Sequence, residues 1–293
     1  MVAVEAAATP SRRFALLMAA RDSDYVLKKY GGYLHVFVAA FGGAGEAWDL
    51  YRAVDGELPA PGDLGAYDGF VISGSPHDAY GDDLWILRLC ALVRELHAMR
   101  KRVLGVCFGH QLICRALGGR VGRARAGWDV GVREVAIADA AAALPPCRFL
   151  DALRERGKLP RRAKITEVHQ DEVRARSITP AFPRTPLQSA DGVLGHGEQV
   201  WEVPEGAEVL ASSDKTGVEM FRVGEHVLGI QGHPEYTKDI LLSLVDRLLA
   251  AGSITVSFAE AVRRQLEATA PDREFWLKLC KSFLKADEDQ VCK

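Results

Sequence analysis

The 293-residue chain lacks several features that mark common classes of protein. Its 37 basic and 39 acidic residues nearly cancel, leaving a formal net charge of −2. That balance removes the electrostatic case for binding nucleic acid or an anionic membrane surface. No apolar run approaches the roughly 20 residues that a membrane-spanning helix needs. We therefore expect no nucleic-acid partner and no membrane partner.

Metal and phosphate motifs are missing as well. The six cysteines form no Cys-x-x-Cys pair, so neither a zinc ribbon nor a thioredoxin-type redox motif is expected. There is no phosphate-binding loop of the form Gly-x-x-x-x-Gly-Lys-[Ser/Thr]. This use of cysteine favours a reduced, intracellular protein, most simply one of the cytosol.

The N-terminus contains no apolar stretch of the signal-peptide kind. We expect residues 1–12 to form a short disordered leader, with a weak transit peptide as the alternative. The length and the 48% hydrophobic content suit one large domain with an appendage. We place a catalytic domain at residues 13–252 and a C-terminal helical extension at residues 253–293.

Strand and helix patterns alternate through the first half of the chain, which favours a parallel sheet with helices on both faces. From about residue 121, strand patterns separated by turns predict antiparallel or mixed pairing. The expected fold is therefore α/β in three layers, with a central mixed, mostly parallel sheet flanked by helices. The expected strands are 13–19, 47–53, 67–76, 103–107, 132–137, 164–169, 208–211, 217–222 and 227–231, and the expected helices are 25–41, 85–100, 111–117, 240–251 and two within 258–285.

The segment 102–111, Arg-Val-Leu-Gly-Val-Cys-Phe-Gly-His-Gln, predicts a cysteine nucleophile. An apolar strand rises to Cys107, which has Gly105 and Gly109 two residues away on either side. Small residues there let the backbone turn sharply into a helix and leave the corner side chain strained and exposed. The dipole at the helix N-terminus favours a thiolate over a thiol. We interpret the neighbouring His110 as a structural helix-start residue rather than a base.

A nucleophilic thiol needs a base, and the base needs a group that fixes its tautomer. The segment 227–235, Val-Leu-Gly-Ile-Gln-Gly-His-Pro-Glu, supplies both. A strand delivers His233 at its C-terminal end, and Glu235 lies on the same side of the extended segment. Pro234 favours an extended conformation at His233. Because the C-terminal ends of parallel strands share one edge, Cys107, His233 and Glu235 are expected to meet there.

An acyl transfer also needs hydrogen-bond donors for the developing oxyanion. The amide of Phe108, directly after the nucleophile, is one candidate. The turn at residues 73–76, Ser-Gly-Ser-Pro, ends a neighbouring strand and offers a second amide, where glycine lets the backbone approach a substrate. We expect an oxyanion hole built from Gly74, Ser75 and Phe108.

Three motifs together resemble the class I glutamine amidotransferase family over roughly residues 13–250. They are Gly-x-Cys-x-Gly-x-Gln at 105–111, His-Pro-Glu at 233–235 and the turn at 73–76. The resemblance implies a flavodoxin-like fold. It also implies that Cys107 is the nucleophile, that His233 acts as base and then as acid, and that Glu235 orients His233.

The same resemblance implies residues that contact the substrate. It places Gln111 near the bound γ-glutamyl group, and the strand-end motif His169-Gln170-Asp171 beside the substrate. For His169 a purely structural hydrogen-bonding role is an equal alternative. Arg123 or Arg125 could pair with a substrate carboxylate, although a solvated face is the simpler interpretation.

Within the family the chain looks most similar to stand-alone, plant-type γ-glutamyl peptidases. The likeness rests on residues 67–79, Phe108, residues 167–171 and the helical tail, and the sequence shows no synthase domain. It implies a cysteine-dependent hydrolase of glutathione and its S-conjugates that releases glutamate through a γ-glutamyl thioester. No metal and no organic cofactor is expected.

Two alternatives stay open, namely a glutaminase subunit that feeds a separate synthase and a non-catalytic regulatory module. The sequence also leaves open the leaving amine, the pathway, the role of the C-terminal helices and a homo-oligomeric state.

Overall fold

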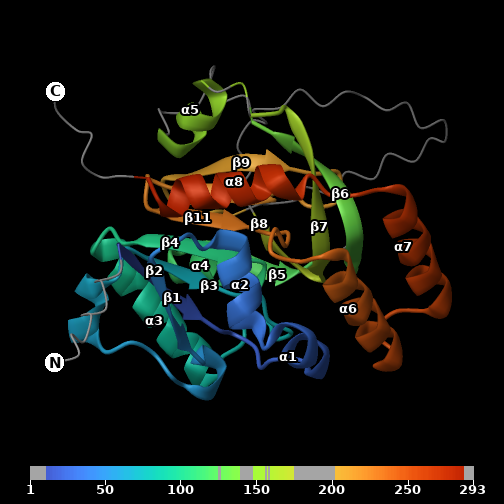
Figure 1. Ribbon diagram of the computed structural model, residues 1–293, viewed down its shortest axis with the longest axis horizontal. Coiled ribbons are helices and arrows are strands. Elements are labelled where there is room, and N and C mark those ends of the chain that lie inside the picture. The colour runs from blue at the N-terminus through green and yellow to red at the C-terminus, as the bar shows by residue number, and fades with distance from the viewer. Residues whose placement is uncertain are drawn as a thin grey trace, which may run out of the picture.

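The computed structural model describes residues 11–124, 127–138, 148–155, 157, 159–174 and 202–286, built around a nine-stranded mixed sheet (Figure 1). Its strand order is β2-β1-β3-β4-β11-β10-β9-β6-β7. Its strands are β1 (Arg12–Leu17), β2 (Glu46–Tyr51), β3 (Gly69–Ile72), β4 (Arg102–Val106), β6 (Asp129–Ile137), β7 (Arg162–His169), β9 (Ala207–Ser212), β10 (Met220–Val223) and β11 (Val227–Ile230). The predicted leader lies outside the described residues except for its last two, and Arg12 already begins β1.

The sheet changes character at β11, as the two halves of the sequence predicted. The pairs that join β2, β1, β3, β4 and β11 are all parallel. The pairs that join β11, β10, β9, β6 and β7 are all antiparallel. The prediction of a mixed sheet flanked by helices is thus confirmed.

The register of the central strands determines where the site forms. Ile72 of β3 and Gly229 of β11 both align with Gly105 of β4. The residues that follow β3, β4 and β11 therefore emerge side by side at one edge of the sheet. This edge collects the turn at 73–76, the cysteine elbow and the segment 231–235.

Helices cover both faces of the parallel half of the sheet (Figure 1). On β1, Phe14 and Leu16 belong to a core that α2 and α8 complete, whereas Ala15 and Leu17 face a second core formed with α3 and α4. This alternation is the two-residue period of a strand buried on both faces. The helices are α1 (Asp24–Tyr30), α2 (Tyr33–Phe41), α3 (Leu84–Ala98), α4 (Phe108–Ala116), α5 (Arg148–Glu155), α6 (Lys238–Ala250), α7 (Val256–Ala268) and α8 (Arg273–Leu284).

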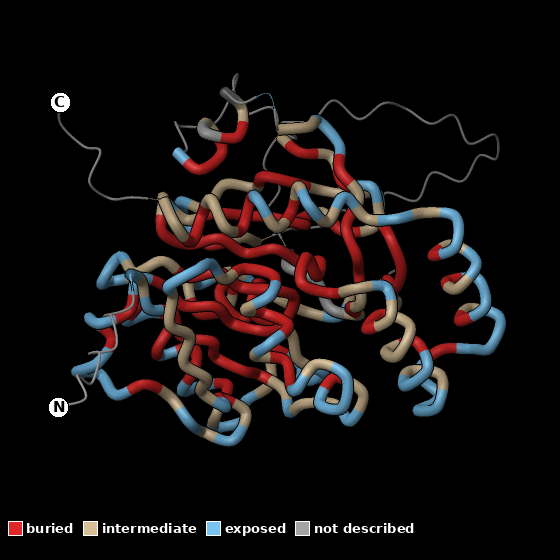
Figure 2. The backbone as a smooth tube through the Cα atoms, in the orientation of Figure 1, coloured by how far each residue is buried: buried red, intermediate tan, exposed pale blue. Residues whose placement is uncertain are grey.

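The predicted C-terminal helices are present and packed. Helix α8 buries Trp276, Leu279, Cys280 and Phe283 almost completely in the same core as β1 and β4. Each large apolar side chain buried in this way stabilises the fold by about 1.5–3 kcal/mol. In Figure 2 buried residues of α8 alternate with intermediate and exposed ones, as expected for a helix that packs one side on the sheet. The domain boundary at residue 252 stays a prediction.

Some elements were not expected from the sequence. Strands β5 (Arg120–Arg123) and β8 (Asp171–Arg174) form a separate two-stranded sheet, and α5 follows the alanine-rich segment. Val121 is the only large apolar residue of β5, so that segment lacks the apolar run that marks other four-residue strands such as β3 and β11. None of the helices in the described parts of the chain is both long and apolar enough to cross a membrane.

Candidate active site

Cys107 lies at the corner between β4 and α4, with φ 51° and ψ −103°. Non-glycine residues rarely adopt such a conformation, which costs on the order of 1–3 kcal/mol. Two main-chain hydrogen bonds hold the corner, from Cys107 N to Ile230 O (2.9 Å) and from Gln111 N to Cys107 O (3.1 Å). The residue is only 5% exposed, so the exposed side chain expected from the sequence is wrong: Val168 O, the Gln231 amide and the turn at Gly74 lie close around it.

The two flanking glycines are needed because the backbones pass too closely for a side chain. A Cβ atom on Gly105 would lie 2.5 Å from the main-chain carbon of Gly109, and one on Gly109 would clash with the carbonyl oxygen of Ile72. The elbow predicted from the Gly-x-Cys-x-Gly spacing is therefore present as a packed feature of β3, β4 and α4.

His233 and Glu235 are hydrogen-bonded to each other at the end of β11. Nδ1 of His233 lies 2.8 Å from Oε1 of Glu235, and both side chains are buried. The main-chain amide of His233 donates to Thr166 O on β7 at 2.8 Å. Because Nδ1 faces Glu235, Nε2 is the ring nitrogen that remains for the thiol.

Gly74 shows how closely the thiol and the imidazole approach each other. A Cβ atom placed on Gly74 would lie 2.8 Å from His233 Cε1 and 3.7 Å from Cys107 Cβ. The structure thus brings Cys107, His233, Glu235 and Gly74 together at one sheet edge. All four were singled out in the sequence.

The charge state of His233 follows from its neighbours. Burial alone would lower its pKa, but the charge of Glu235, the Cys107 thiolate and hydrogen bonds to both outweigh burial and raise the pKa of His233 from 6.5 to about 10. An imidazolium at neutral pH, hydrogen-bonded to Glu235 and lying beside Cys107, can donate a proton to a departing amine.

A chain of amide side chains links Gln111 to Cys107. Gln111 Nε2 donates to Gln231 Oε1 (3.2 Å), and Gln231 Nε2 donates to Cys107 Sγ (3.7 Å). The thiol in turn points at Val168 O, 3.8 Å away. The sequence interpretation included Gln111 but missed Gln231. The sequence did indicate Gln231, because it precedes His233 by two residues and so lies on the same side of an extended segment.

The turn at 73–76 is held in place by its serines. Ser73 Oγ accepts from Ala19 N (2.9 Å) and donates to Gly74 O (3.0 Å). Ser75 Oγ donates to Ala19 O at 2.7 Å, so its hydroxyl secures the turn and only its main chain can serve an oxyanion. Phe108 begins α4, and its ring stacks on Trp85 with centroids 5.6 Å apart.

The predicted substrate contacts His169 and Gln170 lie at the end of β7. His169 Nε2 is 3.4 Å from Glu167 Oε2, and the carbonyl of Gln170 accepts from Ala124 N at 2.8 Å. Glu167 is fully buried. The role of His169 and Gln170 at a substrate and the structural alternative for His169 both stay predictions.

Two buried acids near the thiol were not foreseen. Burial raises the pKa of Glu167 well above its usual range, and the charges of Glu219, Asp129 and Cys107 act in the same direction. Burial likewise raises the pKa of Glu219 to about 8. The pair therefore retains a proton at neutral pH, which limits its repulsion of a thiolate.

His110 fits its structural interpretation. It is fully buried beside Phe221, with ring centroids 4.9 Å apart, and burial lowers its pKa to about 3. Arg123 lies on β5 of the two-stranded sheet, and Arg125 lies outside the described residues. Within the described part of the chain, no group of three or more His, Cys, Asp or Glu side chains is arranged to hold a metal ion.

The fold and this site can now be compared with known proteins. A sequence profile described as "Glutamine amidotransferase class-I" matches residues 51–240. The chain belongs to the class-I glutamine amidotransferase family.

Within that family it is similar to plant peptidases. It is 44% identical to γ-glutamyl peptidase 5 of Arabidopsis thaliana over 284 residues, 96% of this chain and 98% of that protein. It is also 44% identical to γ-glutamyl peptidase 3 of the same plant, over 94% of this chain and 97% of that protein. The similarity supports an enzyme built on the amidotransferase fold.

Solved structures agree on the fold. A glutamine amidotransferase from Thermotoga maritima superimposes with a TM-score of 0.61 at 18% identity, covering 94% of this chain and 99% of that chain. One from Methylobacillus flagellatus gives a TM-score of 0.60 at 16% identity, covering 95% of each chain.

Proposed function

We propose that this protein is a cysteine-dependent hydrolase of γ-glutamyl amide bonds, acting on glutathione and its S-conjugates in the cytosol. The proposal rests on one observation: Cys107 lies next to the hydrogen-bonded pair His233 and Glu235, beside Gly74. The similarity to γ-glutamyl peptidases over nearly the whole chain supports the choice of acyl group.

In the first half of the reaction, the Cys107 thiolate attacks the γ-carbonyl carbon. The carbon–sulfur bond forms while the carbonyl π electrons move to the oxygen, which accepts hydrogen bonds from main-chain amides at Phe108 and in the turn at 73–76. The tetrahedral intermediate collapses, the carbon–nitrogen bond breaks, and the amine leaves with the proton that His233 Nε2 donates. A γ-glutamyl thioester remains on Cys107.

In the second half, water replaces the amine. His233, now neutral, removes a proton from the water as it attacks the thioester carbonyl. Collapse of the second intermediate releases glutamate and restores the thiolate and the imidazolium. Throughout, Glu235 Oε1 accepts a hydrogen bond from Nδ1–H of His233, which fixes the tautomer and stabilises the imidazolium. Each proton and bond is accounted for by these residues and water, so the mechanism requires no cofactor.

The nature of the acyl group explains why glutathione is a reasonable substrate. The γ-amide of glutamine and the γ-peptide bond of glutathione share one acyl group and differ only in the leaving amine. A site that recognises the γ-glutamyl group can bind both glutamine and glutathione if the part of the site that faces the leaving amine is open. The class-I amidotransferase match therefore supports a second candidate, a glutaminase that supplies ammonia to a separate synthase.

A substrate panel that varies only the leaving amine separates the two candidates. Purified protein is assayed for glutamate release from glutamine, glutathione and glutathione S-conjugates of increasing size. We expect the peptides to be cleaved with kcat/KM above that for glutamine. Cleavage of glutamine with rejection of every γ-glutamyl peptide would overturn the proposal in favour of the glutaminase.

A further inference from the structure

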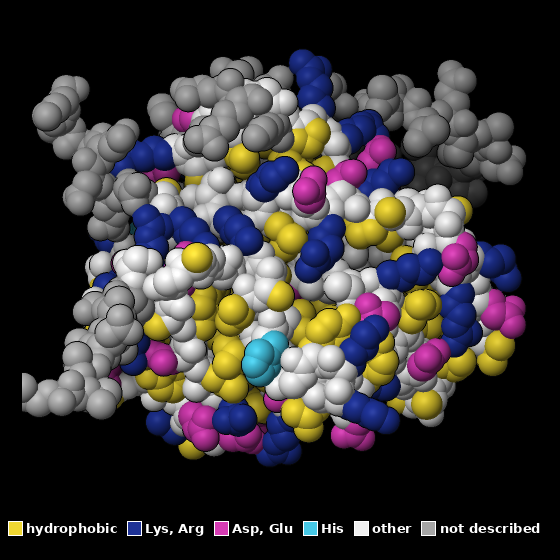
Figure 3. Space-filling view, viewed as in Figure 1, with side chains coloured by type: hydrophobic (Ala, Val, Ile, Leu, Met, Phe, Trp, Pro, Cys, Tyr) yellow, Lys and Arg dark blue, Asp and Glu magenta, His cyan; other side chains and the backbone are white. Residues whose placement is uncertain are grey.

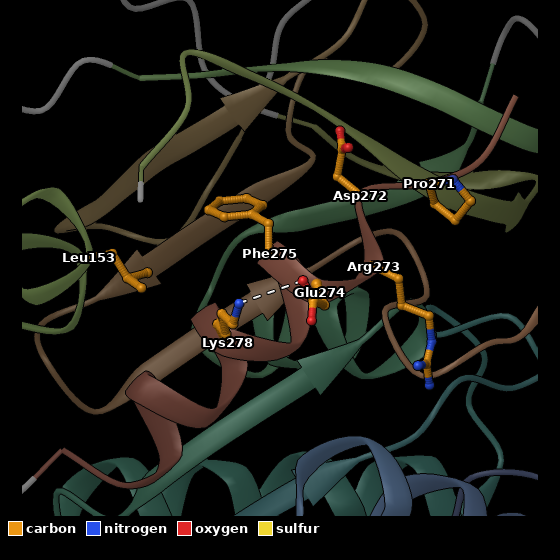
Figure 4. Close-up of a pocket in the computed structure, with 7 residues that line it drawn as sticks. All are labelled: Leu153, Pro271, Asp272, Arg273, Glu274, Phe275 and Lys278. Atoms are coloured by element: carbon orange, nitrogen blue, oxygen red, sulfur yellow. Dashed lines mark ion pairs between the residues drawn. The ribbon is translucent and has the colours of Figure 1, made fainter. Parts of the chain in front are cut away.

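Arg273, the first residue of α8, reaches back to the segment that carries His233 and Glu235. Its Nη2 donates to Glu235 O and its Nε donates to Tyr236 O, both at 3.2 Å. In Figure 4 its side chain points away from Phe275 and Lys278, which line the same surface pocket of about 570 Å³. Arg273 lies beyond residue 240, where the match to the amidotransferase profile ends.

The start of α8 is itself fixed to strand β7. Lys164 N donates to Asp272 Oδ2 (2.7 Å), and Lys164 O accepts from Asp272 N (2.8 Å) and from Trp276 Nε1 (2.9 Å). Two residues further along β7, Thr166 O accepts from His233 N. The start of α8 and the main chain of His233 are thus both anchored to β7.

The two carbonyls that Arg273 binds belong to the residues that hold His233 from two directions. Glu235 Oε1 accepts from the imidazole, whereas Glu235 Oε2 has no hydrogen-bond partner among the described residues. The carboxylate therefore depends on its main chain for its position. Tyr236 lies flat on the imidazole, with ring centroids 4.0 Å apart and planes 5° apart.

We infer that Arg273 is a positioning residue for the catalytic pair, contributed by the C-terminal helix rather than by the part of the chain that matches the family profile. By holding the Glu235 and Tyr236 carbonyls it fixes both the carboxylate and the ring that contact His233. The inference rests on the proposed function. The planar fork of a guanidinium suits two neighbouring carbonyls, whereas a lysine ammonium is a compact donor that can bind one of them.

Lys278 offers a matched control. It lies on the same helix, lines the same pocket and forms an ion pair with Glu274 at 3.7 Å (Figure 4). Basic side chains gather along α8 on the face shown in Figure 3. Lys278→Ala therefore removes one positive charge from the same surface, as Arg273→Ala does.

The test compares Arg273→Ala, Arg273→Lys and Lys278→Ala in the full chain. We expect Arg273→Ala to lower kcat about 10- to 100-fold with KM within about twofold, because a misplacement approaching 1 Å costs up to about 10²-fold in rate. Arg273→Lys should recover part of the loss, and Lys278→Ala should match the wild type. A lowered melting temperature with unchanged kcat in Arg273→Ala would assign a structural role and overturn the inference.

A second measurement does not depend on the substrate. Alkylation of Cys107 by iodoacetamide is followed from pH 5 to pH 10 by mass spectrometry of the Cys107 peptide. We expect the rate profile of Arg273→Ala to differ from that of the wild type, because a less well held imidazolium stabilises the thiolate less. Identical profiles would overturn the inference. Alkylation needs no γ-glutamyl compound. If the substrate panel fails, the proposed function is contradicted, but the alkylation profiles still test whether Arg273 positions His233.

Discussion

Replacing Gly74 with alanine tests the geometry of the site with a single methyl group. The new Cβ would lie 2.8 Å from His233 Cε1, whereas ordinary van der Waals contact begins at about 3.4 Å. The imidazole must therefore retreat by at least about 0.6 Å, the difference between the two distances. Tyr236 is stacked on this ring and Glu235 is bound to Nδ1, so the ring cannot yield without disturbing its partners.

The expected effect is catalytic rather than structural. A displacement of this size costs up to about 10²-fold in rate, so Gly74→Ala should lower kcat about 10- to 100-fold. That loss corresponds to about 1.4–2.7 kcal/mol of transition-state stabilisation. The φ angle of Gly74 is not among the positive values found at other glycines, so the backbone itself tolerates alanine.

The assay is the steady-state rate of glutamate release, accompanied by thermal denaturation. Gly65→Ala is the matched control, because a Cβ on Gly65 meets nothing within 4 Å and φ there is not positive either. Wild-type kcat in Gly74→Ala would refute the arrangement of Cys107, His233 and Gly74 described here. An equal loss in the Gly65→Ala variant would show that the effect is not specific to the site.

Three further predictions follow from buried groups. Glu235→Gln should lower kcat by at least 10-fold with intact folding by circular dichroism, because the amide supports the imidazolium less; an unchanged rate would exclude Glu235 as the orienting group. Gly109→Ala should destabilise the fold by about 2 kcal/mol or more through its clash with Ile72 O; an unchanged urea midpoint would contradict the packing of the elbow. The pKa of Glu219 is about 8 in the fold and ordinarily 4.5, so between these pH values the folded state binds a proton that the unfolded state has lost. The free energy of unfolding should therefore fall as pH rises from 4.5 to 8. Urea titrations should show a weaker pH dependence in Glu219→Gln, and the same dependence in the variant as in the wild type would refute this.

The geometry of the candidate site was predictable because its sequence signals are local. The glycines around Cys107 are spaced for a tight turn, and His233-Pro-Glu235 combines a base and its partner within three residues at a strand end. The parallel pairing in the first half of the chain also followed from alternating strands and helices. These signals require no knowledge of which distant segments meet.

Residues that act through long-range contacts were missed for the opposite reason. Arg273 lies far along the chain from Glu235, and nothing in its neighbourhood on α8 distinguishes it from Lys278. Glu167 lies on β7 and Glu219 in the connection between β9 and β10, so their proximity appears only once these segments are folded. Tyr236 had a weak signal, since an aromatic residue directly after the His-Pro-Glu motif can cover the imidazole.

The most direct test of the central claim is the rate of glutamate release from glutathione by Cys107→Ala, beside the same substitution at Cys90. Cys90 is also buried, but it lies on α3 in the core. We predict that Cys107→Ala releases no glutamate above background, that Cys90→Ala stays close to the wild-type rate, and that acid-quenched wild-type protein carries a γ-glutamyl group on the Cys107 peptide. Glutamate release by Cys107→Ala at the wild-type rate would contradict the account.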